Sequence, residues 1–290
     1  MSAPVSSVHV MQSALDGKKL PSLPLVVQKL IEAANAPNAE TRQLASLIGQ
    51  DAGIAVRVLR LANSPFFGLS GEVGSIQQAV VVLGFQAIAQ LAASVGLMQA
   101  IKVEHCERFD IRQFWTSSMR AAASARWFAL QQNMNGENAY LAGLLHDIGL
   151  PVAVMCFPDA MNHVLTHSHA AAPDLLVREQ AQLGFDHLSL GRELAQTWNV
   201  PSIIVEPIAH YRHPPEAEGP NLTDILHVAW RVAVETINTP DPAQIFDTVA
   251  EPVRSRTKLT LDTLIEVLSE LTRCAPEIEA LLHTAGGASA

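Results

Sequence analysis

The segment Tyr140-Leu-Ala-Gly-Leu-Leu-His146-Asp147-Ile-Gly-Leu-Pro151 decides how the rest of the chain is interpreted. Its first six residues are mostly apolar, and they lead directly into an imidazole beside a carboxylate. Gly149 and Pro151 are typical of a helix end, so we expect the pair on a mostly buried helix. Burying these groups costs free energy unless each finds a hydrogen-bonding partner, a proton or a metal ion. The sequence therefore predicts something polar opposite His146 and Asp147.

Two interpretations of this pair remain open. Adjacent helical residues point about 100° apart, so both side chains can bind one metal ion only if it lies near the helix surface between them. In the other interpretation, His146 bonds to a backbone carbonyl and Asp147 caps or pairs locally. A two-residue motif favours the second unless other residues supply further ligands.

The composition indicates a helical globular protein. The chain has 290 residues, 49% of them hydrophobic, which is enough for two subdomains that each bury a core. Aromatic residues make up only 5%, and the apolar residues recur at helical rather than alternating spacing. The predicted fold class is all-α, a helical bundle of two subdomains.

Charge is unevenly distributed along the chain. The net charge is −9; residues 1–110 hold eight Lys and Arg against eight Asp and Glu, whereas the remainder holds eleven against twenty. An acidic surface repels phosphate backbones, and the chain has no cluster of Lys and Arg interleaved with aromatic residues. We therefore expect no direct binding of nucleic acid.

The cysteines and the apolar stretches bear on the compartment. Cys106, Cys156 and Cys274 are scattered without CxxC spacing, which favours reduced thiols and a cytoplasmic protein without a signal peptide. The uncharged stretch between Glu72 and Lys102 is long enough to cross a membrane. Five glutamines and a central glycine interrupt it, so we expect two buried helices there and no membrane span.

Capping residues, prolines and apolar spacing together predict the helices. The expected ranges are 25–35, 41–49, 51–62, 76–83, 85–101, 114–131, 138–149, 151–167, 173–183, 187–198, 201–211, 225–237 and 261–272. The densely charged stretch 102–112 marks the boundary between the subdomains. The expected division is a leader over 1–19, an N-terminal subdomain over 20–108, a second subdomain over 109–282 and a disordered tail over 283–290.

Several motifs, in order along the chain, resemble those of the HDOD domain, the HD-related output domain of bacterial signalling proteins. The motifs of the N-terminal half are Leu-Pro-Ser-Leu-Pro at 20–24, Gln-Asp at 50–51, Leu-Ala-Asn-Ser-Pro at 61–65 and Ser-Ile-Gln-Gln-Ala at 75–79. In the C-terminal half, the segment around His146-Asp147 and Gly-Phe-Asp-His at 184–187 resemble the core shared with HD and HD-GYP phosphohydrolases. The resemblance covers about residues 20–240 and implies that the second subdomain is HD-like.

The resemblance also implies a metal site that this chain has partly lost. HD phosphohydrolases hold divalent metals with a first His, the His-Asp pair and a distal Asp. The first position falls on Thr116, Ser117 and Ser118, and the last on Trp230. A hydroxyl is a poor ligand and an indole is none. The remaining candidate ligands are His146, Asp147, His187 and His210, the last of which matches a histidine used by HD-GYP proteins.

Without a preorganised ion there is no activated water, so the sequence favours a protein that is not an enzyme. We expect a stand-alone, non-catalytic regulatory protein that needs no cofactor and contacts signalling or regulatory proteins, with a homodimer plausible. One alternative is a metal-dependent phosphohydrolase that uses the altered ligand set with a divalent transition metal. Another is a sensor of a nucleotide-type anionic ligand, with Ser117, Arg120 and Trp230 lining the pocket beside His146 and His187.

Overall fold

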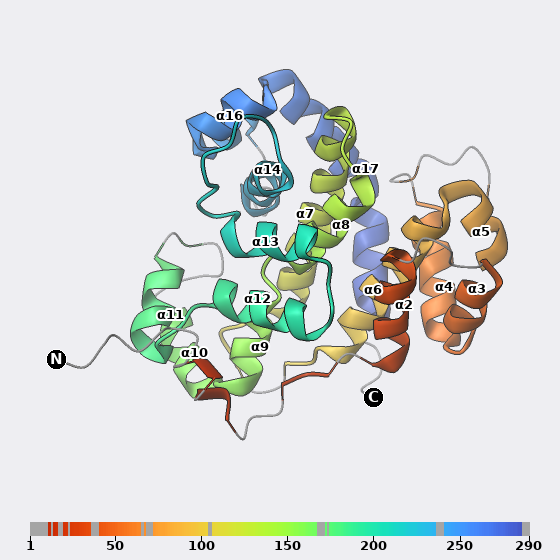
Figure 1. Cartoon of the computed structure of the whole chain (residues 1–290), viewed down its shortest axis with the longest axis horizontal. Helices are drawn as coiled ribbons and strands as arrows, with labels where there is room; N and C mark the ends of the chain where they lie inside the picture. Colours follow the sequence, from red (N-terminus) through yellow and green to blue (C-terminus); the bar gives the residue numbers. More distant parts are fainter. Residues whose placement is uncertain are drawn as a thin grey trace.

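The structure is a computed structural model that describes residues 11–12, 14–16, 20–22, 24–35, 41–64, 67, 72–103, 106–166, 172, 174–235 and 241–285. Within these ranges the chain forms α-helices and no β-strands, which confirms the all-α prediction (Figure 1). Most of the expected leader and of the expected tail lies outside the described residues.

In the N-terminal group, four helices pack against a fifth, which is buried. They are α2 (Leu25–Asn35), α3 (Thr41–Gly49), α4 (Ala52–Ala62), α5 (Ile76–Leu83) and α6 (Phe85–Ala100). Helix α6 is buried from Ala87 to Met98, and both α2 and α4 pack along it. A Cβ at Gly96 would lie 2.3 Å from Val27 Cγ2, so this glycine lets α2 approach closely. Burial of apolar residues all round α6 accounts for its uncharged sequence.

Side-chain caps start two of these helices where the sequence predicts. Asp51 accepts a hydrogen bond from the Ile54 amide at 3.0 Å and begins α4. Ser75 accepts one from the Gln78 amide at 3.1 Å and begins α5. Each cap satisfies an amide that has no partner inside its helix.

The second group of helices is built on a tight hairpin. Helix α7 (Ile111–Gln131) packs against α8 (Gly136–Leu145), and α14 (Leu222–Glu235) covers α7. A Cβ at Gly143 would lie 2.6–2.7 Å from backbone atoms of Ala121 and Ala122, so glycine and alanine bring α7 and α8 together. The remaining helices are α9 (Gly149–Cys156), α10 (Pro158–Thr166), α11 (Leu175–Leu183), α12 (His187–Thr197), α13 (Ser202–His210), α15 (Pro242–Thr248), α16 (Glu251–Thr257) and α17 (Leu261–Ala285).

The structure corrects several helix predictions. The range 151–167 is two helices that meet at Phe157, because Pro158 has no amide hydrogen with which to continue α9. Helices α15 and α16 were not expected; each has seven residues, too few for a clear apolar period. Helix α17 does not end near Thr272 but continues through Pro276, because Leu271, Cys274, Ile278 and Leu281 remain buried along one side.

The C-terminal helix connects the two groups. Helix α17 packs on α7 and also reaches α4 in the N-terminal group (Figure 1). A second contact is a hydrogen bond at 3.3 Å, which the Trp198 indole N–H donates to the Pro21 carbonyl. These contacts join both groups into one continuous hydrophobic core.

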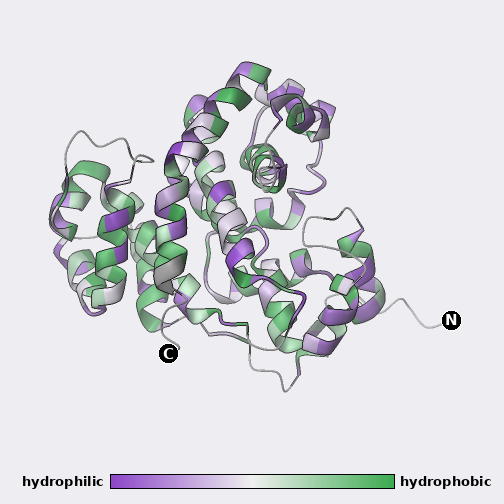
Figure 2. Cartoon of the chain, turned by 180° about the vertical axis from the view of Figure 1, so that it is seen from behind, coloured by the Kyte–Doolittle hydropathy of each residue, from purple (hydrophilic) through white to green (hydrophobic). Residues whose placement is uncertain are grey.

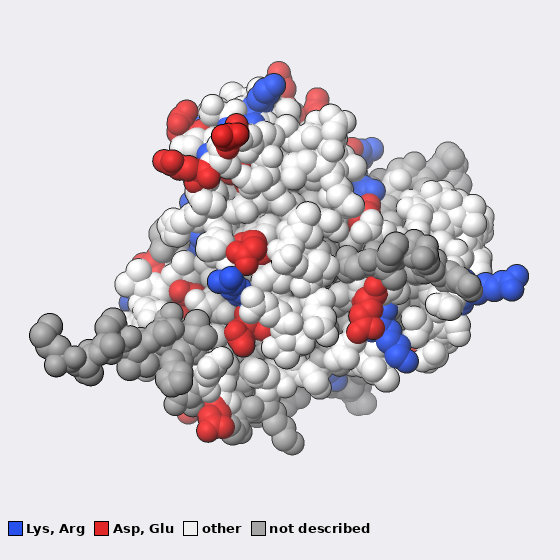
Figure 3. Space-filling view, in the orientation of Figure 1, with Lys and Arg blue, Asp and Glu red and all other residues white. Residues whose placement is uncertain are grey.

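The apolar residues lie mainly inside, and the outer helices show hydrophilic residues on their solvent side (Figure 2). The segment Gly136–Cys156 is long and apolar enough to cross a membrane, but 94% of its most apolar window is buried inside the protein. On the face shown in Figure 3, charged side chains of both signs are scattered over wide uncharged areas.

Candidate functional site

The His-Asp pair lies between two helices, not within one. Helix α8 ends at Leu145 and α9 begins at Gly149, so His146 and Asp147 occupy the turn that joins them. Gly149 and Pro151 therefore open α9, and the prediction that they close the helix was wrong. The relative exposure of His146 is 2% and that of Asp147 is 8%. The turn directs both side chains into the protein.

Two glycines bring His187 next to this turn. A Cβ at Gly149 would lie 1.9 Å from the His187 carbonyl oxygen and 2.6 Å from the Gly191 nitrogen. No side chain fits there, so the start of α9 rests directly on the first turn of α12. His187, the first residue of α12, then reaches Asp147 across this contact: its Nε2 is 3.1 Å from Asp147 Oδ1.

The Asp147 carboxylate is the centre of the site. Its Oδ1 receives hydrogen bonds from His187 Nε2 and from the Tyr211 hydroxyl, which directly follows α13. Its Oδ2 lies 3.4 Å from His146 Nε2. Three side chains from different parts of the chain therefore converge on one carboxylate.

The other ring nitrogen of each histidine is anchored on the far side. His146 Nδ1 donates to the Gly143 carbonyl at 2.7 Å. His187 Nδ1 donates to Glu179 Oε2 at 2.6 Å, and the same oxygen accepts the His187 amide at 2.9 Å. Glu179 is fully buried in α11 at the N-terminal end of α12, where the helix dipole favours a carboxylate.

A buried guanidinium completes the cluster. Arg212 Nε donates to the Tyr211 hydroxyl at 3.0 Å. Its Nη2 lies 3.4 Å from His187 Nε2 and 3.8 Å from Asp147 Oδ1. The guanidinium also lies 4.9 Å from the centre of the Trp230 ring, and only 4% of the Arg212 side chain is exposed. Trp230, a predicted pocket residue, is thus a wall of this site.

The cluster balances its own charge. Burial alone would raise the pKa of the Asp147 carboxyl, but His146, His187 and Arg212 hold that pKa well below its usual range. Burial alone would lower the pKa of His187, whereas the Glu179 and Asp147 carboxylates raise it to about 9. Burial, opposed by Arg212 and reinforced by Asp147, raises the pKa of Tyr211, which stays a neutral donor. The two carboxylates therefore face two cations, His187 and Arg212.

Of the other predicted site residues, His210 lies away from Asp147, and Arg120 and Ser117 lie on α7. The His210 side chain is half exposed, with its Nε2 3.6 Å from Glu206 Oε2 one turn earlier on α13. Because adjacent residues point in different directions, the site receives Tyr211 and not His210. Arg120 is half-buried on α7, where burial lowers its pKa and the Glu279 carboxylate of α17 raises it. Ser117 is half-buried on α7, and we find no hydrogen bond between it and the cluster.

Sequence reasoning missed Glu179 and Arg212. Glu179 stands among ordinary helix-forming residues eight positions before His187, and it belongs to none of the motifs. Arg212 stands in the polar sequence Arg-His-Pro-Pro at 212–215, which indicates only the end of a helix. The sequence therefore offers no local signal for either residue.

The resemblance to HD phosphohydrolases implies a metal ion, and these residues do not fit one. Within the described part of the chain, no group of three or more His, Cys, Asp and Glu side chains is arranged to hold a metal. The space facing Asp147 and His187 is taken by the Tyr211 hydroxyl and the Arg212 guanidinium. A guanidinium is always cationic and cannot act as a ligand, so the site repels a second cation.

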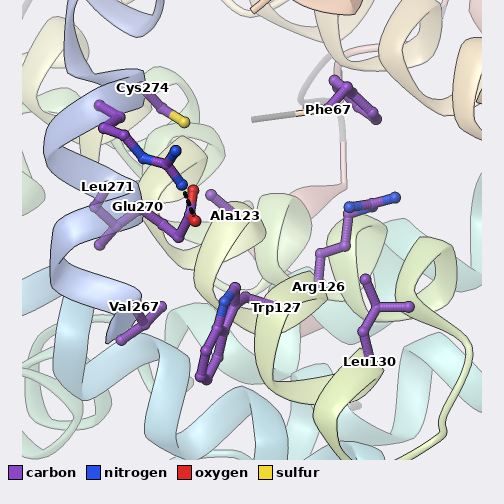
Figure 4. Close-up of a pocket in the computed structure, with 10 residues that line it drawn as sticks. Phe67, Ala123, Arg126, Trp127, Leu130, Val267, Glu270, Leu271 and Cys274 are labelled. Atoms are coloured by element: carbon purple, nitrogen blue, oxygen red, sulfur yellow. Dashed lines mark hydrogen bonds and ion pairs between the residues drawn. The ribbon is translucent and has the colours of Figure 1, made fainter. Parts of the chain in front are cut away.

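A separate cavity lies between α7 and α17, beside Phe67 (Figure 4). Its volume is about 220 Å³, and Trp127, Leu130, Val267 and Leu271 form its apolar walls. The lining residues also include two arginines that are each paired with a glutamate: Arg126 with Glu137 at 3.0 Å, and Arg273 with Glu270. We call the group of six contacting residues described above the Asp147 cluster; its members are Asp147, His146, His187, Glu179, Tyr211 and Arg212. The cavity is distinct from this cluster, because none of its lining residues belongs to it.

Known proteins share this fold over nearly the whole chain. The structure is similar to a crystal structure from Shewanella amazonensis SB2B, provisionally named a phosphohydrolase, with a TM-score of 0.77, 26% identity, and coverage of 96% of this chain and 99% of that one. An HDOD domain protein of unknown function from Geobacter sulfurreducens has a TM-score of 0.76, 21% identity, and 97% and 98% coverage.

Two further similar proteins are longer than this chain. A protein from Marinobacter aquaeolei VT8, provisionally named a signal transduction protein, has a TM-score of 0.74, 24% identity, and coverage of 97% of this chain and 66% of that one. An uncharacterised protein of Treponema pallidum is 29% identical over 236 residues, which are 78% of this chain but only 44% of that protein. The chain thus spans less than half the length of that relative. The HDOD domain matches residues 20–214, and the chain belongs to the HDOD domain family.

Proposed function

We propose that this protein is a non-catalytic regulatory member of the HDOD family that acts through contacts with signalling or regulatory proteins. One observation carries the proposal: the chain closes its own HD site with Tyr211 and Arg212. An HD-type hydrolysis needs a metal ion to polarise the phosphate and activate water. Here the Asp147 carboxylate is already neutralised by hydrogen bonds and by a buried guanidinium.

The names of similar proteins are compatible with either role. One similar structure is provisionally named a signal transduction protein and another a phosphohydrolase. The local chemistry favours the first, because a buried Arg replaces neither the Lewis acid nor the nucleophile of a hydrolase. Cytoplasmic location, the absence of a membrane span and the absence of direct nucleic-acid contact remain part of the proposal.

The test is an assay of the full chain with Mn²⁺, Fe²⁺, Co²⁺ or Ni²⁺ against cyclic dinucleotides and nucleotides. We expect no turnover above that of an Asp147→Asn variant prepared identically. Affinity capture from the native host, with both proteins as bait, should recover the same partner. Metal-dependent turnover that Asp147→Asn abolishes would show that the protein is a hydrolase.

The cavity between α7 and α17 favours a second candidate, a ligand sensor. Apolar walls beside arginines suit a small molecule with an apolar body and an anionic group. The volume of about 220 Å³ is too small for a dinucleotide and suits a compact aromatic carboxylate. We expect such compounds to raise the melting temperature of the wild type but not of Ala123→Leu, which fills the cavity. Equal shifts in both proteins would contradict this candidate.

A further inference from the structure

The two histidines of the Asp147 cluster are oriented as metal ligands are. Histidines that bind metals usually donate one ring N–H to a carbonyl or carboxylate, which turns the other nitrogen toward the ion. His146 donates from Nδ1 to the Gly143 carbonyl, and His187 donates from Nδ1 to Glu179. Both Nε2 atoms face Asp147, at 3.4 Å and 3.1 Å. Each Nδ1 is therefore fixed by a hydrogen bond of the kind that supports metal-binding histidines.

The position of the ion itself is taken by a side chain. Arg212 Nη2 lies 3.4 Å from His187 Nε2 and 3.8 Å from Asp147 Oδ1, so it faces the same two groups that an ion would contact. The Tyr211 hydroxyl links the guanidinium to the carboxylate, and the Trp230 ring lies beneath it. A guanidinium needs less dehydration than a metal ion or an ammonium group, so it suits a buried site.

We propose that Arg212 is a built-in cation that replaces the metal ion of an HD site, and that removing its charge uncovers a transition-metal site formed by His146, Asp147 and His187. The inference rests on the proposed function in one respect, since the wild type must be free of metal. Two neutral imidazoles and a carboxylate are a ligand set that suits Zn²⁺ and Co²⁺. In the variant, the ion would displace the Nε2 proton that His187 donates to Asp147, and that proton would be released to solvent. The ordinary alternative is that Arg212 is only an ion-pair partner, with no metal site behind it.

The experiment compares the full-length wild type with Arg212→Met, which keeps most of the side-chain length and loses the charge. Arg192→Met is the matched control, because the Arg192 side chain is 44% exposed and pairs with Glu206 at 3.0 Å away from Asp147. Binding of Co²⁺ is followed by its visible absorption and by elemental analysis after gel filtration. We expect Arg212→Met to bind Co²⁺ at least about tenfold more tightly than the wild type and the control do.

A second substitution assigns the ligands. Adding His187→Gln to Arg212→Met should remove the gain, because it takes away one imidazole and leaves the cavity made by Met unchanged. A gain that survives this substitution would place the metal elsewhere and overturn the inference. Loss of folding is also informative: Arg212→Met that refolds only with Co²⁺ supports the inference, and a variant that stays unfolded with and without Co²⁺ contradicts it.

The outcomes separate this inference from the proposed function. Tight metal binding by the wild type itself would overturn both, because Arg212 would then exclude nothing. Folded Arg212→Met that binds no Co²⁺ would overturn this inference alone and leave the non-catalytic function unaffected. Metal bound by the variant only is the expected result.

Discussion

Two buried aspartates face arginines in this protein, and the two pairs differ in geometry. Asp224 of α14 is fully buried, and Arg256 of α16 holds both of its oxygens, with Nε 2.8 Å from Oδ2. Asp147 instead divides its oxygens among two imidazoles and a phenol, while Arg212 stays 3.8 Å away. The first is a two-pronged ion pair that joins two helices. The second is a carboxylate shared among several hydrogen-bond donors, with no two-pronged contact to its arginine.

The comparison shows what a guanidinium does in each place. At Asp224 its flat fork matches the carboxylate, so the pair is complete by itself. At Asp147 the arginine adds charge but makes no fork, because the carboxylate is already bonded to other groups. The Asp224 pair should therefore depend on its arginine for stability more than the Asp147 cluster does.

The largest effect should come from separating the parts of the Asp147 cluster. In Gly149→Ala, the new methyl group would overlap the His187 carbonyl oxygen, 1.9 Å away, and force α9 from α12. We expect the free energy of unfolding to fall by more than about 5 kcal/mol, measured by urea denaturation. Gly74→Ala is the control, since nothing lies within 4 Å of its Cβ position. Equal stability of the two variants would mean that this close contact does not hold the cluster together.

The Asp224 pair should show the next largest effect. Arg256→Met leaves a fully buried carboxylate without its fork, which should lower the free energy of unfolding by about 3–5 kcal/mol. Arg178→Met removes an exposed pair with Asp174 and should cost less than about 0.5 kcal/mol. Both are measured by denaturant titration at neutral pH. A loss for Arg256→Met as small as that of Arg178→Met would show that the buried Asp224 pair stabilises the protein no more than an exposed pair does.

His227 connects the two regions and makes stability depend on pH. Its Nδ1 donates to the Tyr211 carbonyl at 2.7 Å, and its Nε2 accepts the amide of Ala250, the residue before α16, at 3.2 Å. Burial first, then the charges of Arg231 and His213, lower its pKa to about 4, although the Tyr211 carbonyl and Asp224 act in the opposite direction.

The direction of this pH dependence follows from the number of protons that the folded and the unfolded chain bind. Between pH 6.5 and 4 the unfolded chain binds a proton at His227 and the folded chain does not. The contribution of His227 to stability should be full above pH 6.5 and should fall by about 3 kcal/mol as the pH drops to 4. Denaturant titrations across this range should show a shallower slope for His227→Gln. Identical slopes would show that His227 is already charged in the folded protein.

Arg212→Met should have the smallest effect of the four. Asp147 keeps its hydrogen bonds from Tyr211 and His187 and its contact with His146, so we expect a loss of about 2 kcal/mol. Arg192→Met should be near the wild type, since its pair is exposed. Thermal and urea unfolding of both variants provide the measurement. A larger loss for Arg212→Met than for Arg256→Met would reverse the comparison, because Arg212 would then be the dominant support of its aspartate.

The sequence by itself determined the helical class, most helix boundaries and two of the central residues. Asp51 and Ser75 cap helices where local chemistry requires it, since a cap bonds only to amides within its own first turn. His146 and Asp147 could be recognised because an imidazole and a carboxylate within an apolar run need a buried partner. These signals are all local.

Only the tertiary structure decided which residues complete the site. Nothing in the sequence around Glu179 or Arg212 indicates that they belong to the site. They join it only because α11, α12 and the end of α13 meet at Asp147. The choice of Tyr211 over His210 depends on the rotation of α13, which is set by packing and not by the His-Tyr pattern. Gly149 illustrates the same limit: its sequence context indicates a helix end, whereas its role is to let two backbones touch across 40 residues of chain. Contacts between distant segments depend on three-dimensional packing, which local periodicity does not encode.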